Sequence, residues 1–327
     1  MTRKERISSI DTIKFIAAIA VIVIHFAPEG LLGRVLQVIS RFAVPYFFMV
    51  SGFFSANKEC EAINRTIKKM VNITLGISIF YFVVAVYHSG FRQIISEFSC
   101  DNFLKVILFN APQIVSAHLW YMYALIYCYV IYKIYLKVSS TKLDVFIGFV
   151  LIILHLILVE ILPWGGITVF RDNYPLVRNV WLMGFPFFLI GKSIFSYKEK
   201  LCGSKVTGVI YICVIVGVLM AGFTGAYNFS YFLPMYVSSV LISIGVFVLA
   251  VRYPYFGQNT IFEKLGHNES MWLYLIHPVI GNLVISEITE GELSWSTFFI
   301  IVIVTILFAK ILSSIGTKIK GVHSIWR

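Results

Sequence analysis

Ten long apolar runs constrain this chain more than any other feature of its sequence. Each run has about 17 to 22 residues, and a helix of that length crosses the ~30 Å hydrocarbon core of a bilayer. The runs lie at residues 11–28, 36–56, 69–87, 118–136, 143–163, 179–196, 206–226, 231–251, 270–288 and 296–316. This pattern predicts an all-α fold: a polytopic membrane protein with about ten transmembrane helices that forms a single domain over residues 1–327.

The composition agrees with a membrane protein. Hydrophobic residues make up 59% of the 327 residues and charged residues 13%, which is too apolar for an ordinary soluble domain. The net charge of +11 is compatible with nucleic-acid binding, but in membrane proteins an excess of lysine and arginine more often lies in cytoplasmic loops. We therefore expect a lipid bilayer, and no nucleic acid, as partner. The five cysteines share no metal-like spacing, so we expect neither a disulfide framework nor a metal site.

The positions of the basic residues predict the topology. If the N-terminus is cytoplasmic, all but six of the 27 lysines and arginines fall in the segments that face the cytoplasm. Such a bias follows the positive-inside rule and places both termini in the cytoplasm. The long outer connection at residues 88–117 is partly apolar, and we expect a surface or re-entrant helix there.

The first run carries two ionisable residues on one face. Lys14 and His25 are eleven residues apart, which in a helix is just over three turns, roughly 16 Å of rise, and a return to within about 20° of the same direction. Asp11 belongs to the same stripe. An ionisable side chain in a span is costly unless it faces protein or water, so this stripe is a candidate site. The alternative is that Lys14 snorkels to the interface and His25 makes a structural polar contact.

Further polar residues stand at or inside the later runs. His277 lies mid-span, and Pro278 leaves a backbone carbonyl one turn earlier without its helical donor. That carbonyl could accept a hydrogen bond from His277, so a structural role and a site role stay equally open. His118, Trp120 and Tyr121 begin another span, where they fit either an aromatic belt or a site that orients a sugar acceptor.

Four stretches of the chain resemble the acyltransferase-3 family of integral membrane acyltransferases. They are the pair Lys14 and His25, the segment RFAVPYFFMVSGF at residues 41–53, the basic segment RTIKK at 65–69 and YLIHP at 274–278. The stretches occur in the family's order and cover nearly the whole chain. Two details depart from the usual pattern: Lys14 replaces an arginine, and residues 65–69 are an imperfect R-x-x-R.

The resemblance implies an activity. Family members take an acyl group, usually acetyl from acetyl-CoA, and place it on a hydroxyl of a surface glycan. We therefore expect an O-acetyltransferase in a bacterial cytoplasmic membrane, with acyl-CoA and a glycan or lipid-linked glycan as partners and no permanently bound cofactor. Some relatives form the membrane part of serine racemases, so a transporter of a small, serine-like solute is the alternative. A non-catalytic scaffold is a third reading.

The resemblance also assigns roles to residues. His25 is expected to be the catalytic base because acyl transfer to an alcohol needs a group that accepts a proton near neutral pH. Lys14 and Arg41 are expected to assist it, although a helix-end arginine such as Arg41 also snorkels. The expected donor-binding residues are Arg65, Lys68 and Lys69, which suit either the phosphates of coenzyme A or anionic lipid headgroups. The expected acceptor-binding residues are His118, Trp120, Tyr121 and His277.

Overall fold

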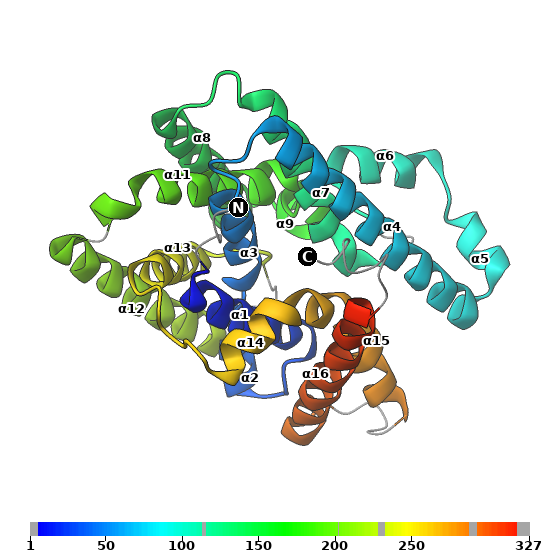
Figure 1. Cartoon of the computed structure of the whole chain (residues 1–327). Helices are drawn as coiled ribbons and strands as arrows, with labels where there is room; N and C mark the ends of the chain where they lie inside the picture. Colours follow the sequence, from blue (N-terminus) through cyan, green and yellow to red (C-terminus); the bar gives the residue numbers. More distant parts are fainter. Residues whose placement is uncertain (1–5, 113–115, 202, 228–232, 288–292, 319–327) are drawn as a thin grey trace. The chain divides into compact units, whose positions relative to one another are not determined.

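Within the part of the chain that the structure describes, every regular element is a helix (Figure 1). This structure is a computed structural model, and it describes residues 6–112, 116–201, 203–227, 233–287 and 293–318. The prediction of an all-α membrane protein is confirmed.

The helices form two compact units, and each is described by itself. The first unit comprises residues 1–50 and 197–320. Its helices are α1 (Ser8–Phe26), α2 (Leu31–Ser40), the first part of α3 (Ala43–Phe53), α12 (Ser204–Ala226), α13 (Val237–Arg252), α14 (Ile261–Asn268), α15 (Ser270–Glu287) and α16 (Trp295–Lys318).

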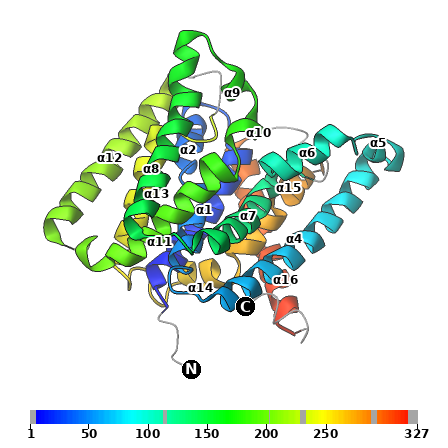
Figure 2. The same ribbon diagram turned by 90° about the horizontal axis from the view of Figure 1, so that it is seen from above.

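The second unit comprises residues 51–196 together with the C-terminal residues 321–327, which lie outside the described ranges. Its elements are α4 (Cys60–Ser89), α5 (Phe91–Ser96), α6 (Cys100–Phe109), η1 (Ala117–Leu119), α7 (Trp120–Tyr135), α8 (Thr141–Leu156), η2 (Ile157–Ile161), η3 (Leu162–Gly165), α9 (Val169–Asp172), α10 (Tyr174–Val177), η4 (Val180–Gly184) and most of α11 (Phe185–Leu201). Figure 2 shows α5 joining α4 to α6. These two short helices account for the helix expected within residues 88–117.

Seven helical segments of the described residues are long and apolar enough to cross a membrane, and each coincides with one of the predicted runs. The other three runs are also helical, as α7, α13 and α15, but these helices are shorter or less apolar. The number of ten spans and the cytoplasmic location of both termini therefore stay predictions.

The second run is interrupted rather than continuous. Its helical segment extends from Leu31 to Phe53, but the chain turns at Arg41 and Phe42, between α2 and α3. Pro45 supplies the physical reason, because it has no N–H to donate to the carbonyl of Arg41 and its ring crowds that carbonyl. Arg41 thus lies at the turn that ends α2 and precedes α3.

Helix α1 is the central element of the first unit. It contacts α2, α13, α14, α15 and α16, and Figures 1 and 2 both draw it among its neighbours. Its sequence is apolar on almost every face, as expected for a helix that is surrounded by protein. Ala17, Ala18 and Ile22 are fully buried. Because the two alanine side chains are small, the backbones of neighbouring helices can approach α1 closely.

Two glycines let α14 and the loop before it lie directly on the first turns of α1. A Cβ added to Gly266 would lie only 1.7 Å from the carbonyl oxygen of Asp11, and one added to Gly257 would lie 2.2 Å from the hydroxyl oxygen of Thr12. Gly257 also has a φ of +73°, which glycine adopts far more readily than other residues. This close approach brings the polar side chains of α14 to Asp11.

Replacing Gly266 by alanine tests that contact. We expect Gly266→Ala to lower the free energy of unfolding by about 1–3 kcal/mol, because the methyl group overpacks the α1–α14 contact. The matched control is Gly208→Ala on α12, where an added Cβ meets nothing within 4 Å. Because alanine favours a helix, the control should be neutral or stabilising by up to about 1 kcal/mol. Thermal unfolding in detergent measures both, and equal midpoints for the two variants would contradict the contact.

Candidate functional site

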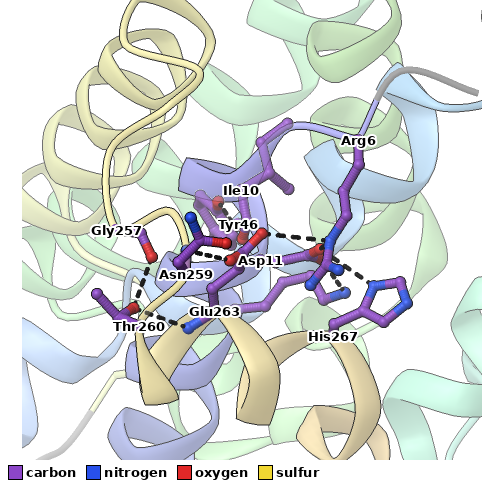
Figure 3. Close-up of polar contacts among 10 residues, drawn as sticks. Arg6, Ile10, Asp11, Tyr46, Gly257, Asn259, Thr260, Glu263 and His267 are labelled. Atoms are coloured by element: carbon purple, nitrogen blue, oxygen red, sulfur yellow. Dashed lines mark hydrogen bonds and ion pairs between the residues drawn. The ribbon is translucent and has the colours of Figure 1, made fainter.

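A group of charged side chains surrounds Asp11 at the start of α1 (Figure 3). The Asp11 carboxylate accepts hydrogen bonds from Lys14 Nζ at 2.8 Å, Arg6 Nε at 3.0 Å and His267 Nδ1 at 3.1 Å. The Asp11 side chain is only 10% exposed. A carboxylate removed from water to this extent needs such partners. We call Arg6, Asp11, Lys14, Glu263 and His267 the Asp11 cluster.

Glu263 joins this cluster from the first turn of α14. Its carboxylate lies 3.4 Å from Arg6 Nε and accepts the backbone N–H of Asn259 at 2.7 Å. The backbone N–H of Glu263 in turn donates to Thr260 Oγ1 at 3.3 Å, so Thr260 caps α14. The side-chain hydrogen bond with Ser8, followed by the bond from Asn259, holds the pKa of Glu263 below its ordinary value.

The side chains that donate hydrogen bonds to Asp11 differ in exposure. The side chain of Lys14 is 19% exposed, whereas those of Arg6 and His267 are 45% and 50% exposed. Lys14 is therefore held in the interior by its carboxylate partner. Arg6 and His267 present surface that a ligand can reach. With His267 neutral, the two carboxylates balance the charges of Arg6 and Lys14.

Further along α1, His25 lies beside His277 of α15. The two imidazole centroids are 5.1 Å apart, and His25 is exposed whereas His277 is fully buried. His277 Nδ1 lies 2.7 Å from the carbonyl oxygen of Tyr274. This is the carbonyl that Pro278 deprives of its helical donor, so the hydrogen bond expected from the sequence is confirmed. The continuous helix α1 also confirms that Lys14 and His25 share one helix.

The basic residues of the second unit that were predicted to bind the acyl donor lie on the first turns of α4. Arg65 and Lys68 are exposed, and Lys69 is partly buried. Arg65 Nη1 lies 3.8 Å from Glu61 Oε2, and the two side chains are 75% and 85% exposed, respectively. An ion pair exposed to this extent contributes little, so the Arg65 guanidinium is available to an anion.

Two of the three side chains in the group predicted near residue 118 are buried against protein. His118 and Trp120 are buried, whereas Tyr121 is partly exposed. His118 Nδ1 lies 2.6 Å from Ser116 Oγ, and its ring centroid is 4.7 Å from that of Tyr81. Burial shows that His118 and Trp120 pack against protein, and both interpretations of this group stay predictions.

Sequence reasoning missed four residues that take part in these contacts: Arg6, Glu263, His267 and Arg178. Glu263 and His267 follow Asp11 by about 250 positions, and only the T-x-x-E pattern at Thr260, typical of a helix N-terminus, marks their helix. Arg178 is one of the six basic residues expected outside the cytoplasmic segments, and its guanidinium carbon lies 5.4 Å from the ring centroid of Trp120. The described residues contain no group of three or more histidine, cysteine, aspartate or glutamate side chains suited to a metal.

A family model described as an acyltransferase domain matches residues 7–314. The chain belongs to the acyltransferase-3 family. The matched range includes the two histidines, the basic turns of α4 and every member of the Asp11 cluster except Arg6. Together with the apolar helices, membership of the acyltransferase-3 family identifies a multi-pass membrane protein.

Among curated proteins, this acyltransferase-3 chain is similar to enzymes named as racemases. An amino-acid racemase of Enterococcus faecalis is 24% identical over 353 aligned positions, covering 97% of this chain and 47% of the relative. A serine/alanine racemase of Enterococcus gallinarum is 25% identical, covering 91% of this chain and 45% of the relative. The chain thus spans about half the length of these relatives. No solved structure matches it.

The lowered pKa of Glu263 predicts a pH dependence of stability. A carboxyl group whose pKa is lower in the folded state stabilises the fold above its unfolded pKa, and this contribution disappears as the pH falls through the folded value. We expect Glu263→Gln to lower the thermal midpoint at pH 7, and the difference from the wild type to shrink as the pH falls below the ordinary glutamate value of 4.5.

The control for this experiment is Glu287→Gln, which changes an exposed carboxylate on α15. Its midpoint should follow that of the wild type across the same pH range. A constant offset between wild type and Glu263→Gln from pH 7 to pH 3.5 or so would contradict the linkage.

Proposed function

We propose that the chain is a membrane O-acyltransferase, in its simplest form an O-acetyltransferase. It would move an acyl group from cytosolic acyl-CoA to a hydroxyl of a cell-surface glycan or its lipid-linked precursor, in a bacterial cytoplasmic membrane. The observation that carries the proposal is the family match over residues 7–314 to a chain whose central helix holds an exposed histidine above a lysine.

His25 is the proposed general base. The hydroxyl oxygen of the acceptor attacks the thioester carbonyl while His25 takes the hydroxyl proton. The carbon–sulfur bond then breaks, and the thiolate leaves with the proton that His25 returns. Histidine suits this exchange because its ordinary pKa lies near neutral pH. The exposure of His25 supports the assignment, since a base must be reachable by its substrate.

Binding of the acyl donor is proposed for the first turns of α4, where cations would hold the phosphates of coenzyme A. The exposed side chains of Arg65 and Lys68 favour this role, since clustered cations suit phosphates. Lys14 lies roughly 16 Å below His25 along the helix axis, so the acyl thioester has to enter the helix bundle to reach the base.

Acceptor binding is proposed for the outer part of the second unit. His118, Trp120 and Tyr121 supply ring faces and polar groups that can orient a sugar, and Arg178 stands over Trp120. Arg41, partly buried at the turn between α2 and α3, is proposed to steady negative charge on the acceptor or on the oxyanion.

A second candidate function is supported by the relatives. The chain spans about half of two proteins named as amino-acid or serine/alanine racemases. A membrane part of such a protein could carry a small polar solute such as serine. Uptake of labelled serine into proteoliposomes without acyl-CoA would favour this function, whereas consumption of acetyl-CoA without serine uptake would favour the acyltransferase.

Replacing His25 tests its assignment as the general base of acyl transfer. We expect His25→Gln to reduce transfer of label from radioactive acetyl-CoA to the glycan fraction of membrane vesicles by about 10²-fold or more, because the hydroxyl proton loses its acceptor. His88→Gln, which changes an exposed histidine at the end of α4, should leave transfer unchanged. Full activity in His25→Gln would end the assignment of His25 as base.

Neutralising the basic turns of α4 tests donor binding. We expect Arg65→Gln, Lys68→Gln and Lys69→Gln together to raise the Kd for acetyl-CoA by about tenfold or more, since each charge-assisted contact is worth roughly 1.5–3 kcal/mol. Binding is measured on protein in nanodiscs of zwitterionic lipid, which removes competition from anionic headgroups. A triple variant of three other exposed lysines, Lys133, Lys137 and Lys142, is the matched control. Equal Kd values for both triple variants would indicate a role in topology or lipid contact alone.

A further inference from the structure

The hydrogen bond between His277 and Tyr274 fixes the position of one proton. A backbone carbonyl only accepts hydrogen bonds, so the contact of 2.7 Å requires that His277 Nδ1 carries the hydrogen. The Tyr274 carbonyl is available because Pro278, four residues later, has no N–H. A neutral His277 ring therefore has its lone pair on Nε2.

The packing of α15 on α1 fixes the ring itself. His277 is fully buried, and its ring meets that of Phe26 nearly edge-on, at a centroid distance of 6.4 Å and an angle of 81°. Gly281, one turn further along α15, leaves room for the Phe26 ring, since a Cβ there would lie 2.2 Å from it. Buried and packed in this way, the imidazole has little freedom to turn.

The ring centroids of His25 and His277 are 5.1 Å apart at an interplanar angle of 41°, so a rotation of the His25 ring would bring a nitrogen of each imidazole within hydrogen-bond reach. His25 is exposed, so one edge of its ring can face His277 while the other faces an incoming substrate. In many sites a catalytic base is held in this way by a further group that accepts its second N–H.

We propose that His277 is a positioning residue for His25, accepting the N–H of the His25 ring at its Nε2 and leaving the other nitrogen of His25 to take the hydroxyl proton of the acceptor. This role rests on the proposed function and differs from substrate binding by His277. It makes Pro278 part of the site, because the proline frees the carbonyl that sets the His277 tautomer.

A neutral imidazole suits this position for an electrostatic reason. When His25 gains a proton, its N–H toward His277 becomes a charge-assisted hydrogen bond, which is stronger than a neutral one. A carboxylate in the place of His277 would add a negative charge to the membrane interior, at a cost whenever His25 is neutral. The histidine supports the charged state of His25 without that cost.

The first experiment separates catalysis from binding. We expect His277→Phe to lower kcat for acetyl transfer by about 10–100-fold, the usual effect of losing such a partner, with the KM for acetyl-CoA unchanged. His277→Gln should recover part of the lost kcat, because its amide oxygen can accept the N–H of His25. A wild-type kcat in His277→Phe, or no recovery by glutamine in a folded protein, would overturn the proposal.

The second experiment reads the tautomer directly and needs no activity. Nitrogen-15 spectra of histidine-labelled protein in nanodiscs should show His277 protonated at Nδ1, with the signal assigned from its loss in His277→Gln. Pro278→Ala restores an N–H that competes for the Tyr274 carbonyl, so it should weaken the Nδ1–H signature and lower kcat while α15 stays helical. Protonation at Nε2 in the wild type would overturn the proposal. A protein with the expected tautomer but no acyl transfer would contradict the proposed function instead.

Discussion

The cost of placing charge in a low-dielectric interior governs the structure around α1. Asp11 is nearly buried at the start of a span-length helix, and a lone carboxylate there would destabilise the fold by several kcal/mol. Lys14, Arg6 and His267 all donate to it. Each of these donors is then held in place by the same carboxylate, so Asp11 positions both the partly buried Lys14 and the helix that carries His267.

That interaction depends on close backbone packing. Gly266 lets α14 approach the carbonyl of Asp11 in the first turn of α1, and Gly281 makes room for the ring of Phe26 at the last residue of α1. Small residues have the same use in membrane helix packing generally, where lipid supplies no hydrophobic drive between helices. The two polar centres of the first unit, the Asp11 cluster and the histidine pair, are thus both built where a glycine brings a second helix against α1.

Local rules predicted a large part of this arrangement. The shared face of Lys14 and His25 follows from the helical repeat, and the hydrogen bond of His277 follows from the missing N–H of Pro278. The turn at Arg41 follows from Pro45 by the same reasoning, yet the mostly apolar sequence around it favoured one continuous helix. The enclosure of His118 and Trp120 was not predictable, because an aromatic residue at a helix end looks the same in sequence whether it faces lipid or protein.

The sequence by itself determined that the chain is a bundle of apolar helices, which family it resembles and which face of the first span carries ionisable groups. These properties depend on composition and on contacts within a few residues. Only the tertiary structure decided that Asp11 accepts a hydrogen bond from His267 and that His25 lies beside His277. Such pairs join segments about 250 residues apart. The packing of whole helices decides which residues meet, and no local pattern of residues encodes that packing.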